Sequence, residues 1–228
     1  MKDILGRANM ELIVFLSLGT ILMLMVMLYL RKNYQIARWK TILSTLCLTL
    51  SGVAGTKIMF WIETGKTGGT SFFGAIFLVP LLMALVALIL KIPVRVLVDM
   101  CAPAECVMLA LMKLRCLYFG CCAGRILYEN GELQIRFPSQ IAEMIMILII
   151  LVFLVRLIQR NQFEGKIYAW YMISYGTTRF LLNLLRETKP FVWILPAGNF
   201  WSLISISIGI LWILLIRKNQ TRVLRGGK

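Results

Sequence analysis

Long runs of apolar residues, separated by short polar segments, constrain this chain more than any other feature of its sequence. Each run is about 20 residues long, the length that an α-helix needs to cross the hydrocarbon core of a bilayer. Because a backbone inside lipid must satisfy its own hydrogen bonds, runs of this length favour helices over strands. The predicted membrane spans cover residues 10–30, 41–62, 71–90, 94–119, 141–157, 167–185 and 200–216.

The composition agrees with a chain that lies almost wholly in a membrane. Hydrophobic residues make up 60% of the 228 residues and charged residues only 15%, with a mean hydropathy of +0.82. A soluble domain usually has about half apolar and a quarter charged residues. The spans and their short loops leave no stretch for a sizeable soluble domain. We therefore predict one all-α domain, a polytopic transmembrane bundle of about seven helices covering residues 1–228.

Basic residues set the predicted orientation of the chain. The net charge of +15 would suggest nucleic-acid binding in a soluble protein, but the sequence has no nucleic-acid motif. In a membrane protein, Lys and Arg collect in the cytoplasmic loops. The segments after the first, third, fifth and seventh runs hold most of the loop Lys and Arg residues. We expect the N-terminus outside, the C-terminus in the cytoplasm, and no nucleic-acid partner.

Several charged residues lie in or near the apolar runs, where a charge is costly unless it pairs with an opposite charge or contacts water. In one interpretation they form interhelical ion pairs that fix the packing. In the other, the cations line an outward-facing site for an anionic lipid headgroup, because Lys and Arg both bind phosphate. The excess of cations over acids favours the headgroup site. The cations are Lys57, Lys113, Arg115, Arg179 and Arg186, and the acids are Asp99, Glu105 and Glu143.

Arg179 is the cation that needs a partner most. It lies in the middle of a run, in the segment ISYGTTRFLLNLLR, and Asn183 one turn later offers no counter-charge. Its partner is expected to be Asp99, Glu143 or a bound phosphate. We expect phosphate, because other cations in the runs compete for the two carboxylates.

Three cysteines in the segment KLRCLYFGCCAGR, residues 113–125, allow three interpretations. They are small buried residues, or Cys116 forms a disulfide with Cys121 or Cys122 on an oxidising side of the membrane, or one of them is a thiolate activated by Lys113 or Arg115. Their spacing does not match a closed zinc site, and the chain contains no histidine. We predict neither a metal nor an organic cofactor.

The order of several short blocks resembles one family. The blocks are GTK in the second run, GGTSFFG, DMCAPAECVMLALMKLRCLYFGCCAG, RFPSQIAE, YGTTRFLLNLLR and GNFWSLI, and they extend over about residues 52–216. In this order the chain resembles the prolipoprotein diacylglyceryl transferases, multi-pass enzymes of the bacterial inner membrane. The resemblance implies transfer of a diacylglyceryl group from phosphatidylglycerol to the lipobox cysteine of a prolipoprotein. The cysteine sulfur displaces the phosphate group, which arginines hold.

The resemblance and the excess of cations in the apolar runs together give expected roles to particular residues. The residues expected to be catalytic, by their match to the family's motifs, are Arg179, Glu143, Gln140 and Tyr175. Those expected to hold the phosphate and headgroup are Lys57, Lys113, Arg115, Arg125, Arg179, Arg186, Asp99, Gly120 and Gly124, with Cys116, Cys121 and Cys122 as possible thiols nearby.

The chain departs from the family pattern at several positions. Phe73 and Phe137 stand where the family has histidines, and Lys113 stands at an arginine. Cys116 and Cys121 stand at an asparagine and a glutamate of the family. The phosphate-holding residues are therefore kept in outline, whereas the proton-handling residues are changed. The alternative function is a non-catalytic lipid-binding or accessory membrane protein on the same scaffold.

Overall fold

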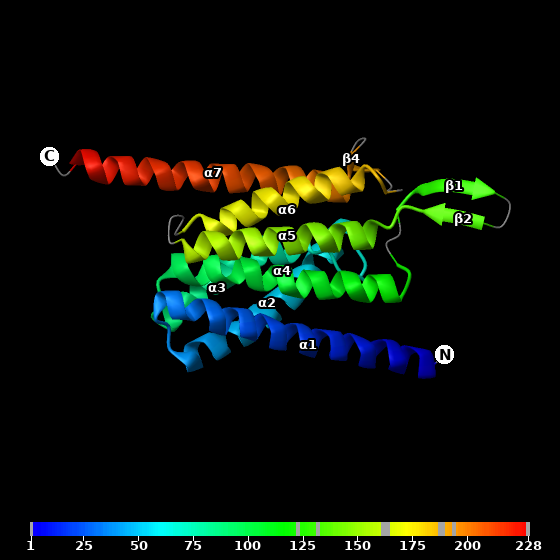
Figure 1. The fold of residues 1–228 in the computed structure, drawn as a ribbon, viewed down its shortest axis with the longest axis horizontal. Coiled ribbons are helices and arrows are strands. Elements are labelled where there is room, and N and C mark those ends of the chain that lie inside the picture. The colour runs from blue at the N-terminus through cyan, green and yellow to red at the C-terminus, as the bar shows by residue number, and fades with distance from the viewer. Residues whose placement is uncertain are drawn as a thin grey trace.

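The computed structural model describes residues 2–121, 124–130, 133–160, 165–186, 190–192 and 195–226. Within these residues the chain forms a bundle of helices that run up and down past one another (Figure 1). The helices are α1 (Lys2–Tyr34), α2 (Arg38–Thr64), α3 (Phe73–Ile89), α4 (Val94–Tyr118), α5 (Ser139–Gln159), α6 (Ile167–Asn183) and α7 (Ala197–Gly226). The predicted helical class is confirmed.

Two short β-hairpins were not predicted from the sequence. Strands β1 (Ile126–Asn130) and β2 (Leu133–Arg136) pair antiparallel, as do β3 (Pro190–Val192) and β4 (Leu195–Pro196). Both lie at the end of the bundle where α4 and α6 end and α5 and α7 begin (Figure 1). We call this the hairpin end, and the other the opposite end.

Four helical segments in the described part of the chain are long and apolar enough to cross a membrane. They are Glu11–Tyr34, Arg38–Thr64, Ser139–Gln159 and Ala197–Lys218, and α3 is a shorter apolar helix. Helix α4 carries charged residues along its length, and α6 has only 17 residues. The structure therefore supports a helical membrane protein, and it leaves the number of spans as a prediction.

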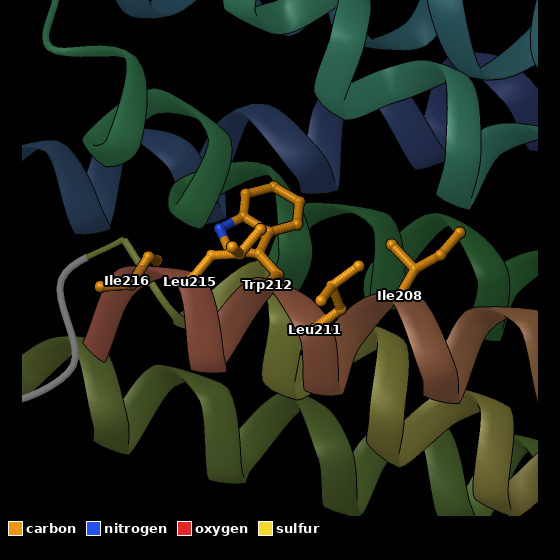
Figure 2. Close-up of a pocket in the computed structure, with 5 residues that line it drawn as sticks. All are labelled: Ile208, Leu211, Trp212, Leu215 and Ile216. Atoms are coloured by element: carbon orange, nitrogen blue, oxygen red, sulfur yellow. The ribbon is translucent and has the colours of Figure 1, made fainter. Parts of the chain in front are cut away.

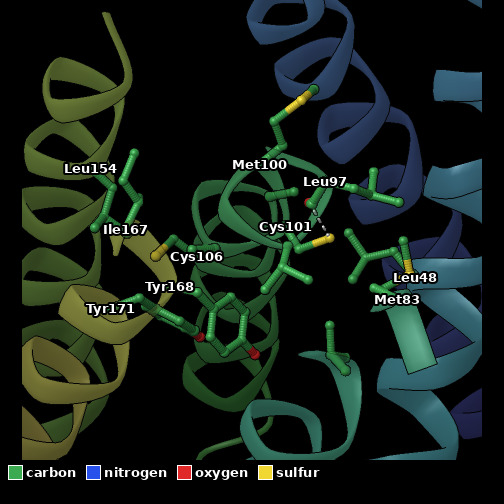
Figure 3. Packing of buried hydrophobic residues seen from close by; sticks show 14 of the residues in the cluster. Leu48, Met83, Leu97, Met100, Cys101, Cys106, Leu154, Ile167, Tyr168 and Tyr171 are labelled. Atoms are coloured by element: carbon green, nitrogen blue, oxygen red, sulfur yellow. Dashed lines mark hydrogen bonds between the residues drawn. The ribbon is translucent and has the colours of Figure 1, made fainter. Parts of the chain in front are cut away.

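Helix α4 lies at the centre of the bundle and contacts α1, α3, α5 and α6. Figure 3 shows its residues Leu97 and Met100 packed among buried side chains of neighbouring helices, with Tyr168 and Tyr171 of α6 on one side. All four side chains are fully buried. This packing holds α4 and α6 in a fixed register, which matters because both helices contribute to the site described below.

Close helix contacts depend on small residues, as is usual in membrane bundles. A side chain at either Gly55 of α2 or Gly74 of α3 would collide with the backbone of the other glycine. The backbone N–H of Ser71 donates to the carbonyl oxygen of Thr56 at 2.9 Å beside this contact. Together these contacts fix the turn between α2 and α3 against the end of α2.

At the opposite end, Asp99 joins α4 to α6. Its carboxylate accepts hydrogen bonds from the backbone N–H groups of Gly165, at 2.5 Å, and Tyr168, at 3.0 Å. Asp99 is fully buried. The first N–H groups of a helix have no partner within the helix, so this carboxylate satisfies backbone donors where α6 begins.

Candidate functional site

The carboxylate of Glu143 is the centre of a charged cluster at the hairpin end of the bundle. Glu143 is the fifth residue of α5 and is 1% exposed. Its Oε2 atom lies 2.6 Å from a guanidinium nitrogen of Arg179, 2.8 Å from Nζ of Lys113 and 3.9 Å from a guanidinium nitrogen of Arg186. One buried carboxylate thus holds three cations.

The cations reach Glu143 from two other helices. Lys113 lies in the last two turns of α4, Arg179 lies in the last two turns of α6, and Arg186 follows the end of α6. Their side chains are 12%, 17% and 13% exposed, respectively. These residues are far apart in the sequence, and they meet because α4 and α6 end, and α5 begins, at the hairpin end of the bundle. A charge that is removed from water must be paired, and these pairs meet that need.

The expected partners of Arg179 can be compared with this geometry. Glu143 was one of the three expected partners, and the structure pairs the two residues. Asp99, another expected partner, lies 14 residues from Lys113 along α4, which is about 20 Å of helical rise. The structure places Asp99 at the opposite end, bound to the start of α6, and not in the cluster.

A glycine allows three backbone segments to meet beside the cluster. The N–H of Gly124 donates to the carbonyl oxygen of Phe137 at 2.9 Å, and the N–H of Arg125 donates to that of Leu185 at 3.0 Å. A Cβ atom at Gly124 would lie 2.6 Å from the Phe137 oxygen and 3.0 Å from the Leu185 oxygen. Only glycine fits this approach without a shift. The segment after α4, the start of α5 and the end of α6 are held together here.

Two further predicted residues lie in this arrangement. The amide nitrogen of Gln140 donates to the carbonyl oxygen of Cys121 at 2.6 Å, and both Gln140 and Glu143 are buried on α5. The hydroxyl of Tyr175 donates to Oε1 of Glu143 at 3.5 Å, a long contact. Gly120, with φ of 65°, ends α4 and begins the loop that brings Cys121 to Gln140.

The other predicted residues lie around the cluster rather than in it. Lys57 is exposed on α2, and Arg125 is exposed in the loop after α4. Arg115 lies over the ring of Phe119, with its guanidinium carbon 4.7 Å from the ring centroid. Cys121 is an exposed thiol. The structure does not place any of these four side chains against Glu143.

The structure of the loop after α4 bears on the disulfide interpretation of the cysteines. Cys116 is half-buried and its carbonyl oxygen accepts the N–H of Cys121 at 3.0 Å. A disulfide between Cys116 and Cys121 is not formed in this structure. Cys122 lies outside the described residues. Among the described residues, no group of three His, Cys, Asp or Glu side chains that could hold a metal ion occurs.

An aromatic wall borders the cluster on the side of α3. The ring centroid of Phe73 lies 5.8 Å from that of Tyr175, and that of Phe72 lies 5.4 Å from the same ring. Phe73 also stacks on Phe77 at 6.1 Å, which lies 6.1 Å from Trp201 of α7. Buried and half-buried aromatic rings therefore connect the charged cluster to the space between α3 and α7.

An apolar groove begins where the aromatic wall ends. It has a volume of about 570 Å³ between α3, α4, α6 and α7. Its lining residues include Phe77, Pro80, Ala84, Met172 and Trp201. A second groove of about 400 Å³ follows α7 toward the opposite end, lined by Ile208, Leu211, Trp212, Leu215 and Ile216 (Figure 2). Ile208 and Trp212 line both grooves, so the two adjoin along α7.

Sequence reasoning missed Glu63 as a member of this region. Glu63 is the second-last residue of α2, and its Oε1 accepts a hydrogen bond from the hydroxyl of Ser71 at 2.6 Å. Its charge also interacts with Arg179. An acid at the end of an apolar run was a signal for it, but the fold of the turn after α2 was needed to place it.

These features define a helical membrane protein with a cation-rich polar site beside an apolar groove. A sequence model of one family, prolipoprotein diacylglyceryl transferase, matches residues 13–215. The match covers most of the chain, including every residue of the charged cluster. The chain therefore belongs to the prolipoprotein diacylglyceryl transferase family.

Two curated proteins are similar to this chain. It is 28% identical over 193 residues to phosphatidylglycerol–prolipoprotein diacylglyceryl transferase 2 of Clostridium perfringens, which covers 74% of this chain and 75% of the relative. It is also 28% identical over 111 residues to the phosphatidylglycerol–prolipoprotein diacylglyceryl transferase of Verminephrobacter eiseniae, which covers 46% of this chain and 40% of the relative.

Proposed function

We propose that this protein transfers the diacylglyceryl group of phosphatidylglycerol to the lipobox cysteine of a prolipoprotein. The observation that carries the proposal is the convergence of Lys113, Arg179 and Arg186 on Glu143 beside an apolar groove, in a member of this family. A lipid substrate with an anionic headgroup needs both parts, a polar site for the phosphate and apolar space for the acyl chains.

The charges of the cluster suit a phosphodiester. The three cations pair with Glu143, and Glu63 interacts electrostatically with Arg179, so the formal charge of these five side chains is +1. One phosphodiester carries a single negative charge and would neutralise the group. Arg can hold two phosphate oxygens at once through its planar guanidinium, and Lys supplies a point charge.

The apolar groove suits the acyl chains. Its lining is formed almost wholly by apolar side chains from α3, α4, α6 and α7. The chain of rings from Tyr175 through Phe73 and Phe77 to Trp201 joins it to the cluster. A phospholipid with its phosphate near Arg179 would therefore place its acyl chains along α3 and α7.

In the proposed reaction, the cysteine sulfur attacks the glyceryl carbon that bears the phosphate ester. A carbon–sulfur bond forms while the carbon–oxygen bond breaks, and the electron pair leaves with the oxygen of glycerol phosphate. Negative charge grows on this leaving phosphate. Fixed cations that already face the phosphate stabilise that charge most when they need not move, and the ion pairs with Glu143 hold Lys113 and Arg179 in place.

The proposal includes seven spans, with the hairpin end outside and the opposite end facing the cytoplasm. Loops and helix ends at the opposite end carry many cations, as cytoplasmic segments do. These include Arg31, Lys32, Arg38, Lys40, Lys91, Arg95, Arg156, Arg160, Arg217 and Lys218. This orientation would place the charged cluster at the outer leaflet of the bacterial inner membrane.

Complementation tests the function in cells. A bacterial strain depleted of its standard transferase should grow when it expresses this chain and should stop growing when it expresses the chain with Arg179→Ala at an equal membrane level. Growth failure with the unchanged chain, combined with binding of phosphatidylglycerol by the purified protein, would favour the non-catalytic lipid-binding alternative.

A further inference from the structure

The proposed transfer requires that the acceptor thiol lose its proton, and this chain lacks the usual acceptor. A free cysteine has a pKa of about 8.5, so most of its thiol is protonated at neutral pH. Imidazole is the commonest general base in proteins, but the chain contains no histidine. Phe73 is 4% exposed and packs on Tyr175. Another group at the hairpin end must accept the proton.

Three carboxylates of α4 and α5, those of Asp99, Glu105 and Glu143, are occupied or remote. Glu143 is held by Lys113 and Arg179 at 2.8 and 2.6 Å. Asp99 binds the backbone where α6 begins, at the opposite end. Glu105, 4% exposed in the middle of α4, accepts a hydrogen bond from the hydroxyl of Tyr168 at 2.9 Å. A proton that left a thiol at the hairpin end would not reach the latter two directly.

Glu63 lies on α2, and its position differs from that of these three carboxylates. It lies at the hairpin end, where α2 ends, and it is half-buried rather than enclosed. One of its oxygens accepts a hydrogen bond from the hydroxyl of Ser71 at 2.6 Å. Its partner Ser71 precedes Phe72, whose ring centroid lies 5.4 Å from that of Tyr175, and the Tyr175 hydroxyl contacts Glu143, so Glu63 lies on the α3 side of the charged cluster. It is therefore close to the reacting groups and open enough to meet an incoming peptide.

The surrounding backbone holds Ser71 in place for this contact. The N–H of Ser71 donates to the carbonyl oxygen of Thr56, and the contact between Gly55 and Gly74 brings the start of α3 against α2. The hydroxyl of Ser71 can then fix one oxygen of Glu63 and leave the other for a substrate.

We propose that Glu63 is the general base that accepts the thiol proton of the acceptor cysteine, and that Ser71 positions its carboxylate. This inference rests on the proposed function. The proton moves from sulfur to a Glu63 oxygen, the thiolate sulfur bonds to the glyceryl carbon, and that carbon's bond to the phosphate oxygen breaks. Glycerol phosphate leaves with the electron pair, and the proton on Glu63 is returned to solvent or to the leaving phosphate.

A selenocysteine peptide separates this role from a structural one. A selenol is ionised at neutral pH and needs no base, whereas a thiol does. We would measure product formation by Glu63→Gln protein in phosphatidylglycerol nanodiscs, with lipobox peptides that carry either cysteine or selenocysteine. A positioned general base contributes about 100-fold or more to rate. The cysteine peptide should therefore react roughly 100-fold more slowly than with the unchanged protein, and the selenocysteine peptide should react at a nearly unchanged rate.

Two further variants control the experiment. Glu11→Gln removes one carboxylate from α1 that takes no part in the ion pairs of Lys113, Arg179 and Arg186 with Glu143, and it should leave both rates unchanged. Ser71→Ala should slow the cysteine peptide alone, because the carboxylate remains but is less well placed. This variant also tests the proposal if Glu63→Gln protein is unstable.

Two results would overturn the assignment. Equal losses with both peptides in Glu63→Gln and Ser71→Ala would mean that these residues support the structure or bind lipid. An unchanged rate with the cysteine peptide would mean that another group accepts the proton. If the unchanged protein formed neither the thioether nor the selenoether, the proposed function itself would fail, which is a different outcome.

Discussion

Arg179 and Glu143, which lie 36 residues apart in the sequence, form an ion pair of 2.6 Å between α6 and α5. Lys113 shares the same carboxylate oxygen. The pair therefore belongs to a network of several charges. In the proposed function Arg179 would both hold the bundle together and face the substrate phosphate, and mutation should separate these two tasks.

Replacing Arg179 with Lys should weaken phosphatidylglycerol binding and transfer while the fold persists. Lysine keeps the charge and the pairing with Glu143, but it loses the planar two-point grip on phosphate. We expect a loss of roughly 10-fold or more, which is about 1.4 kcal/mol per tenfold. Lipid binding and thermal stability of Arg179→Lys and Arg179→Ala should be measured side by side. Normal lipid binding by Arg179→Lys together with unfolding of Arg179→Ala would make Arg179 a packing residue only.

Replacing Glu143 with Gln should destabilise the protein strongly. The change leaves three cations around a neutral side chain, and removing one partner of a buried ion pair costs about 3–5 kcal/mol. An anionic lipid should recover part of this loss, because its phosphate can act as the counter-charge. The measurement is the melting temperature in nanodiscs of phosphatidylcholine and of phosphatidylglycerol. An equal loss in the two lipids would indicate that the cations do not reach the headgroup.

Replacing Gly124 with Ala should disrupt the site more than the fold. A Cβ atom there would lie 2.6 Å from the Phe137 oxygen, so the segment must move away from α5 and α6. We expect reduced transfer with membrane insertion intact. The control is Gly68→Ala, because Gly68 has no described atom within 4 Å of an added Cβ. Similar activity of the two variants would argue that the contact at Gly124 does not position the cluster.

Replacing Asp99 with Ala should affect stability rather than lipid binding. The change removes the acceptor for the N–H groups of Gly165 and Tyr168, and each unsatisfied buried group costs about 1–3 kcal/mol. We therefore expect a lower melting temperature and a normal affinity for phosphatidylglycerol below that temperature. A loss of phosphatidylglycerol affinity without a loss of stability would show instead that Asp99 belongs to the headgroup site, as the family resemblance implies.

The helices could be predicted from the sequence because the apolar runs have the length and hydropathy of membrane segments. The described α2, for example, covers Arg38–Thr64, against an expected span of 41–62. The two hairpins could not be predicted in this way. Their strands have two to five residues, too short for an alternating pattern, and their pairing depends on how the helix ends meet.

The site was predictable as a set of residue types but not as a geometry. The excess of cations indicated an anionic ligand, and the structure does bring Lys113, Arg179 and Arg186 together. Asp99 and Lys113 occupy the same helix, but a difference of 14 residues places them at opposite ends. Glu63 was missed because its hydrogen bond with Ser71 and its electrostatic interaction with Arg179 arise only when α2, α3 and α6 pack.

The most direct measurement is a mass spectrum of the acceptor peptide after incubation with the purified protein in phosphatidylglycerol nanodiscs. We expect a peptide whose mass rises by one diacylglyceryl group attached through a thioether, with glycerol phosphate released in equal amount, and no product from Arg179→Ala protein. An unmodified peptide in the presence of folded, lipid-bound protein would contradict the proposed transfer.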